Sequence, residues 1–241
     1  MISKTILQDL NLKIFADGAD INQIRALNET TFIKGFTTNP TLMKKAGVGD
    51  YRSFAKDTLN IIGGKPISFE VFSDDIFEMR RQALEISSWG ENVYVKIPVC
   101  NSKGELNLVV IKELTELGVK VNITAVMTMR QIESCMEALD PSIPSYISVF
   151  AGRIADTGRN PAVIIKEALQ LLSSFSLCEL IWASTREVLN IFQAAELQCH
   201  IITITSDIVA KFELIGLDLH EFSVQTVKMF NQDAALSGYS L

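Results

Sequence analysis

Short, continuously apolar runs recur along the chain, separated by segments with the periodicity of amphipathic helices. Eight such runs can be counted, and their alternation with helical segments is typical of repeated βα units. Because most runs are apolar throughout, they predict parallel strands that helices cover on both faces. The runs are LKIFAD (12–17), FIKGFTT (32–38), ISFEV (67–71), NVYVKIPV (92–99), VKVNIT (119–124), SYISVF (145–150), CELIWAS (178–184) and HIITIT (200–205).

Several of the intervening segments have clear helix boundaries. Residues 74–89 begin with two aspartates and stop at a glycine, and residues 105–117 also end before a glycine. A proline opens the segment 161–172, at a position where helices accept it. A final amphipathic segment, about 220–236, predicts an added helix that could reach a neighbouring subunit.

The count of strands and helices predicts one (β/α)8 barrel (TIM barrel) domain spanning residues 1–241. No Pro/Gly/Ser-rich linker or shift in composition divides the chain. The alternative is a doubly wound open sheet. The first βα turn, FADGAD, lacks the GxGxxG loop of dinucleotide-binding folds, so the barrel is favoured.

The charge and the cysteine content of the chain argue against several classes of function. The formal net charge is −6, and no Lys/Arg cluster is longer than a pair, which predicts no binding of nucleic acid or an anionic membrane. Four widely spaced cysteines form no CxxC pair, so they indicate a reducing compartment and neither a zinc nor a redox site. No secretory signal pattern or membrane-span-length apolar stretch is present. We expect a cytoplasmic protein.

Polar side chains stand at or near the ends of every predicted strand except the last. Singly, each has an ordinary structural role, because an aspartate can cap a helix and a strand lysine can belong to a buried ion pair. Parallel strands direct their inward residues into one volume, and barrel sites lie at the C-terminal ends of strands, so the set predicts a small-molecule site. In strand order the residues are Asp17; Thr37, Thr38 and Asn39; Glu70; Lys96; Asn122 and Thr124; Ser148 and Arg153; Ser184 and Arg186.

Lys96 lies in the middle of the apolar run VYVKIPV, and either half of a buried ion pair or a catalytic amine would explain it. Only a neutral amine attacks a carbonyl, and apolar surroundings disfavour the charged ammonium. A neutral lysine can form a Schiff base with a ketone, and the iminium then weakens the adjacent C–C bond. Breaking that bond requires an acid/base to move the β-hydroxyl proton, for which Asp17 and Glu70 are candidates.

Arg153, Ser184 and Arg186 favour a phosphate site near the later strands. Guanidinium groups match phosphate oxygens, and barrels commonly bind phosphate at this place. The alternative is that both arginines are surface residues or are paired with carboxylates.

In their order along the chain, these elements resemble the transaldolase family, which includes the fructose-6-phosphate aldolases. The resemblance covers about residues 12–230 and implies a (β/α)8 barrel with a Schiff-base lysine on the fourth strand, where the count places Lys96. The matching motifs are IFAD with Asp17, KGFTTNPTL (34–42), VYVKIPV (93–99), VNIT (121–124), SVFAGR (148–153) and WASTR (182–186).

The resemblance also implies a role for each residue. Lys96 forms the Schiff base, Asp17 moves the aldol proton, and Glu70 and Thr124 act through a catalytic water; no metal or cofactor takes part. The implied substrate-binding residues are Thr38, Asn39, Asn122 and Ser148 for the dihydroxyacetone unit, Phe150 as a wall, and Arg153, Ser184 and Arg186 for phosphate.

Three positions separate the two branches of the family. The aldolase branch typically has Gln in place of Glu70 and Tyr in place of Phe150, and it lacks the serine matched by Ser148; here all three follow the transaldolase pattern. The resemblance therefore implies a transferase of the pentose phosphate type, passing dihydroxyacetone from a ketose phosphate, such as fructose 6-phosphate or sedoheptulose 7-phosphate, to an aldose phosphate. It also implies a homo-oligomer of two, five or ten chains.

Two departures from the family pattern leave the acceptor open. Residues 100–104 replace a Trp-Glu-Gly-like element, and Gly18 follows Asp17 where threonine is usual. An aldolase-type lyase, an enzyme for an unusual sugar and a non-enzymatic sugar-phosphate binding protein remain alternatives.

Overall fold

Eight parallel strands close into a barrel in sequence order, each pairing with the next and β8 pairing with β1. The structure is a computed structural model that describes residues 6–238. It confirms the eight predicted strands, with ends shifted by one or two residues. The strands are β1 (Lys13–Asp17), β2 (Ile33–Thr37), β3 (Ile67–Glu70), β4 (Val93–Pro98), β5 (Val121–Val126), β6 (Ser145–Val149), β7 (Cys178–Trp182) and β8 (Ile201–Ile204).

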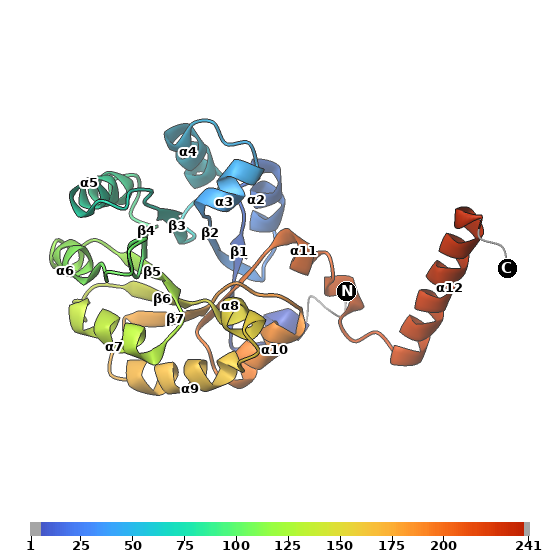
Figure 1. The fold of residues 1–241 in the computed structure, drawn as a ribbon. Coiled ribbons are helices and arrows are strands. Elements are labelled where there is room, and N and C mark those ends of the chain that lie inside the picture. The colour runs from blue at the N-terminus through green and yellow to red at the C-terminus, as the bar shows by residue number, and fades with distance from the viewer. Residues whose placement is uncertain (1–5, 239–241) are drawn as a thin grey trace.

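Helices follow the strands and form the outer layer of the barrel (Figure 1). The predicted helix 161–172 has the expected bounds, and 74–89 and 105–117 are shorter by a few residues. The fold is thus the predicted (β/α)8 barrel. The helices are α2 (Ile21–Asn28), α3 (Pro40–Lys45), α4 (Tyr51–Ile62), α5 (Ile76–Ser87), α6 (Leu108–Glu116), α7 (Met129–Ala138), α8 (Ala151–Asp156), α9 (Pro161–Leu172), α10 (Leu189–Glu196), α11 (Ser206–Val209) and α12 (Leu219–Ser237), with a 3₁₀ turn η1 (Phe212–Leu214).

Strand alternation separates an outer apolar core from the barrel interior. Val95 and Ile97 on β4 are fully buried in the large core between strands and helices. Side chains on a strand alternate between its two faces, so Lys96 between them points into the barrel. The strand register places Glu70 and Asn122 beside Lys96 on the neighbouring strands. One level of the interior therefore collects polar groups.

An aromatic layer lies two residues earlier along the strands and forms the floor of that polar level. Tyr94 and Tyr146 stack with ring centroids 3.9 Å apart, and Phe15 meets Tyr146 edge-on at 5.9 Å. The Phe15 ring lies where a side chain at Gly35 would be, 2.6 Å from an ideal Cβ. The barrel is filled beneath the polar level, so a ligand can approach it only from the C-terminal mouth.

Helix α12 stands away from the barrel in Figure 1. None of its residues is buried, and three of its apolar side chains, Leu219, Val227 and Phe230, are exposed by more than half. The expectation that this helix contacts a neighbouring subunit stays a prediction. Within residues 6–238, no helix combines the length and apolar character needed to cross a membrane.

Candidate active site

A cavity of about 610 Å³ opens at the C-terminal mouth of the barrel, with lining residues from or just after all eight strands. Ten of the twelve predicted site residues line it: Asp17, Asn39, Glu70, Lys96, Thr124, Ser148, Phe150, Arg153, Ser184 and Arg186. The C-terminal ends of the strands meet at one mouth because all eight strands are parallel, which is why residues far apart in the sequence converge.

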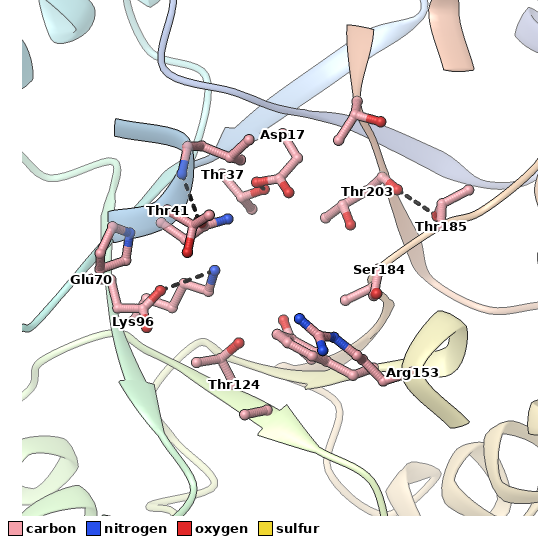
Figure 2. A pocket seen from close by; sticks show the side chains of 18 of the residues that line it. Asp17, Thr37, Thr41, Glu70, Lys96, Thr124, Arg153, Ser184, Thr185 and Thr203 are labelled. Atoms are coloured by element: carbon pink, nitrogen blue, oxygen red, sulfur yellow. Dashed lines mark hydrogen bonds and ion pairs between the residues drawn. The ribbon is translucent and has the colours of Figure 1, made fainter. Parts of the chain in front are cut away.

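The amine of Lys96 is buried and held by two oxygens. The residue is 6% exposed, and Nζ lies 3.2 Å from Oε2 of Glu70 (Figure 2). Nζ also donates a hydrogen bond of 3.1 Å to the carbonyl oxygen of Thr38. The buried-ion-pair interpretation is therefore correct. It does not compete with a catalytic role, because the same amine lines the cavity and has a carboxylate in reach to accept its proton.

Two carboxylates with perturbed proton affinity flank the amine. Withdrawal from water raises the pKa of Asp17, against the opposing effects of the Lys96 charge and of the Thr37 hydroxyl, which donates to Oδ1 at 2.8 Å. Burial likewise raises the pKa of Glu70, with Lys96 opposing and the Asp17 charge adding to the shift. Raised carboxyl pKa values near a buried amine suit groups that both accept and return protons at neutral pH.

A buried hydrogen-bond chain supports the cavity from below. Ser148 donates to Oδ1 of Asn122 at 2.7 Å, and Nδ2 of Asn122 donates to Ser68 at 2.9 Å. Asn122 is fully buried and does not line the cavity, so it orients the Ser148 hydroxyl. Thr38 does not line the cavity either, and its backbone carbonyl makes the contact with Lys96.

The buried hydroxyl of Thr124 lines the cavity and has no hydrogen-bond partner within residues 6–238. A buried hydroxyl without a partner is unfavourable. A water or substrate oxygen in the cavity would supply the missing bond.

The two predicted phosphate-binding arginines differ in their surroundings. Arg186 donates to Asp156 at 2.6 Å, whereas Arg153 has no carboxylate within 4.0 Å in the described part of the chain. Arg153 and Ser184 lie on the side of the cavity opposite Lys96 (Figure 2). Of the two arginines, Arg153 is thus the one without a carboxylate partner among the described residues, and Arg186 matches the carboxylate-paired alternative.

The expectation that the last strand contributes nothing is wrong. Thr203 on β8 lines the cavity, and Thr205 and Asp207 follow it at the mouth. The signal was present in the run HIITIT, where threonines alternate with isoleucines as inward and outward residues should. Among further lining residues, Thr185 after β7 was also missed.

Residues 100–104, the main departure from the family pattern, do not line the cavity. They form a turn closed by an antiparallel bridge between Cys100 and Leu106. The backbone N–H of Ser102 donates to Asp74 at 2.8 Å, which fixes the turn outside the mouth. An altered acceptor side is therefore to be sought elsewhere in the cavity wall.

The carboxyl of Asp17 gives a prediction about stability. Its raised pKa means that the folded protein holds a proton that the unfolded chain releases, so stability falls as pH rises through the interval between the two pKa values. Asp17→Asn removes this cost and keeps an oxygen for the Thr37 hydroxyl. We expect a midpoint of thermal unfolding on the order of 2–4 °C higher at pH 7.5, with activity lost.

The gain should vanish at pH values below the ordinary carboxyl pKa, where Asp17 is protonated in both states. Calorimetry at both pH values checks this, with Asp140→Asn, a substitution outside the cavity, as control. An unchanged or lower midpoint at pH 7.5 would contradict the electrostatic interpretation.

Fold and site together define a (β/α)8-barrel protein with a buried lysine and two carboxylates at its mouth. The model of the family described as "Transaldolase/Fructose-6-phosphate aldolase" matches residues 14–238. A probable transaldolase of Streptococcus equi subsp. zooepidemicus (strain MGCS10565) is 32% identical over 225 residues, which cover 93% of this chain and 98% of that protein. A probable transaldolase of Thermoanaerobacter sp. (strain X514) is 31% identical over 231 residues, covering 95% and 100%.

The chain belongs to the transaldolase/fructose-6-phosphate aldolase family, as its motifs suggested. Among solved structures, 2,3-dimethylmalate lyase, a member of the PEP mutase/isocitrate lyase superfamily, aligns with a TM-score of 0.56 at 13% identity, covering 99% of this chain and 96% of that one. At this identity the likeness shows the fold alone.

Proposed function

We propose that the protein is a transaldolase that moves a dihydroxyacetone unit from a ketose phosphate to an aldose phosphate through a Schiff base on Lys96. The observation that carries the proposal is the buried amine 3.2 Å from Glu70 in a cavity that Asp17 also lines. The names of the relatives, probable transaldolases, support the same reaction class.

The first half of the reaction uses the two carboxyls in turn. Glu70 accepts a proton from Lys96, and the neutral amine attacks the C2 carbonyl of the ketose, which loses its oxygen as water. Asp17 then takes the proton of the C4 hydroxyl as the C3–C4 bond breaks. The bonding electrons flow into the iminium, which becomes an enamine, and the aldose phosphate leaves.

The second half reverses these steps with another aldehyde. The enamine carbon attacks the acceptor carbonyl, and Asp17 returns its proton to the new alkoxide. Hydrolysis of the iminium, in which a catalytic water near Thr124 and Glu70 takes part, releases the new ketose phosphate. Proton transfers of this kind contribute about 100- to 10,000-fold each to the rate.

Side chains around Lys96 can hold the three-carbon unit. Asn39 caps α3 through Oδ1, which accepts from the Leu42 N–H at 3.0 Å, so its amide nitrogen is left for a substrate hydroxyl. Ser148 is fixed by Asn122 and presents its oxygen to the cavity. Arg153, with Ser184 and Arg186 beside it, takes the phosphate.

The lyase alternative predicts a different fate for the enamine. An enzyme that protonates it and releases dihydroxyacetone does not need an acceptor. With Glu70 and Phe150 in place of glutamine and tyrosine, we expect release from fructose 6-phosphate to be slow and transfer to erythrose 4-phosphate to be at least about 10-fold faster, a difference of about 1.4 kcal/mol in barrier.

Measuring dihydroxyacetone and sedoheptulose 7-phosphate with and without acceptor checks this expectation. Release that is equally fast without acceptor would favour the lyase. Binding of fructose 6-phosphate without either product would favour a sugar-phosphate binding protein.

A further inference from the structure

The mouth of the cavity has a polar edge that the proposed reaction leaves without a role. It consists of Thr185, which follows β7, and Thr205 and Asp207, which follow β8; we call these three residues the β8 rim. Thr203 lies on β8 itself, next to Thr185 (Figure 2). The rim lines the same cavity as Lys96 and Arg153, whereas the segment 100–104 does not.

The hydrogen bonds made within the rim leave only hydrogen-bond acceptors for a ligand. The Thr185 hydroxyl donates to the backbone carbonyl of Thr203 at 2.6 Å, and the Thr205 hydroxyl donates to a carboxylate oxygen of Asp207. A hydroxyl has one proton and two lone pairs. Both threonine protons are therefore used within the protein, and what remains for a ligand is lone pairs and a carboxylate.

Capping of the local helix does not account for the contact between Thr205 and Asp207. Thr205 is the N-cap of α11, yet its side chain makes no capping hydrogen bond and turns to Asp207 instead. Asp207 has no lysine, arginine or histidine within 4.0 Å in the described chain. The rim thus contrasts with Arg153, whose guanidinium offers only donors to the same cavity.

We propose that Thr185, Thr205 and Asp207 determine acceptor specificity by binding N–H or O–H donors on the carbon chain of the aldehyde. The inference rests on the proposed transaldolase function and names its acceptor class. A phosphate at the rim is repelled by Asp207, so the anionic end of an acceptor goes to Arg153 and its hydroxyl or ammonium groups go to the rim. A polyhydroxylated or amino-substituted aldehyde fits both contacts, whereas an aldehyde without such donors fits only the first.

The test compares aldehydes that differ only in their donors. Erythrose 4-phosphate is paired with 4-phosphooxybutanal, which lacks its chain hydroxyls, and 3-aminopropanal is paired with propanal. Under saturating fructose 6-phosphate, kcat/KM for each aldehyde reports only the second half of a ping-pong reaction. The ratio of kcat/KM within each pair measures the contribution of the donor groups.

Asp207→Asn should lower at least one of these two ratios by about 10-fold, because a hydrogen bond to a carboxylate is replaced by one to a neutral amide. A fall in the erythrose ratio identifies hydroxyls as the recognised donors, and a fall in the amine ratio identifies ammonium. Thr205→Val is a second variant, and it should shift the same ratio in the same direction. Unchanged ratios in both variants, or an equal fall for all four aldehydes, would overturn the proposal.

Two controls distinguish an effect on acceptor recognition from an effect on Schiff-base formation. Asp140→Asn removes the same charge from a carboxylate that also accepts from a hydroxyl two residues away, Ser142 at 2.7 Å, but lies outside the cavity, and it should change no ratio. Borohydride trapping of dihydroxyacetone, which is the transferred unit and not the acceptor, should label the parent and Asp207→Asn equally. If the parent protein does not trap dihydroxyacetone, the proposed function is wrong. If the parent and Asp207→Asn trap it equally and the kcat/KM ratios of both variants are unchanged, only the proposed role of the rim is wrong.

Discussion

Lys96→Met should abolish borohydride trapping of fructose 6-phosphate and lower kcat for transfer on the order of 10,000-fold or more. Met keeps the length of the side chain but has no nucleophile, and losses of this size follow the removal of a covalent catalytic group. No other lysine lines the cavity within residues 6–238, so a neighbouring amine cannot replace it. Mass spectrometry of the reduced adduct and a coupled assay of transfer measure both effects.

The same substitution leaves the Glu70 carboxyl buried without its cation. Lys96 opposes the raised pKa of Glu70, so its removal should raise that pKa further and make the variant less stable as pH rises. The double variant Lys96→Met/Glu70→Gln removes the stranded charge and should recover stability at pH 7.5 without recovering activity. Transfer by either variant within 10-fold of the parent would show that Lys96 is not the nucleophile.

The fold could be predicted because the buried strands consist almost entirely of apolar residues. A strand covered on both faces must be apolar along its length, so runs such as 92–99 and 145–150 stand out in the sequence. Their ends were less certain, since β5 continues to Val126, two residues past the predicted end. Helix α12 was also predicted, although none of its residues is buried against the rest of the chain.

The charged residues at the centre of the site could also be predicted from the sequence, but the residues at its edge could not. Lys96 and Glu70 interrupt apolar runs, and a charge within such a run is conspicuous. Whether a strand-end side chain enters the cavity or lies beneath it depends on strand register, which one sequence does not specify. Asn122 therefore does not line the cavity but accepts a hydrogen bond from Ser148, which does, and Asp207, in an ordinary-looking helix start, was not predicted.

Gly152→Ala should destabilise the protein by about 3 kcal/mol or more and disable its phosphate side, because there is no space for a methyl group at this position. An ideal Cβ on Gly152 would lie 1.7 Å from the carbonyl oxygen of Ser184 and 2.8 Å from its carbonyl carbon. Both are backbone atoms and cannot rotate away, so either α8 or the segment after β7 must move. Ser184 already has a φ of 63°, in the left-handed region, which leaves that segment little freedom to adjust.

The displaced parts carry Arg153 and Ser184, so KM for phosphorylated substrates should rise about 10-fold or more while dihydroxyacetone is still trapped on Lys96. Chemical denaturation measures the loss of stability, and the KM values for the ketose phosphate and the aldose phosphate measure the loss of phosphate binding. Gly49→Ala is the matched control, because no atom lies within 4 Å of its Cβ position and its φ is not in the left-handed region. If Gly152→Ala kept the stability of the control, the close approach of α8 to the end of β7 could not be what holds Arg153 at the mouth.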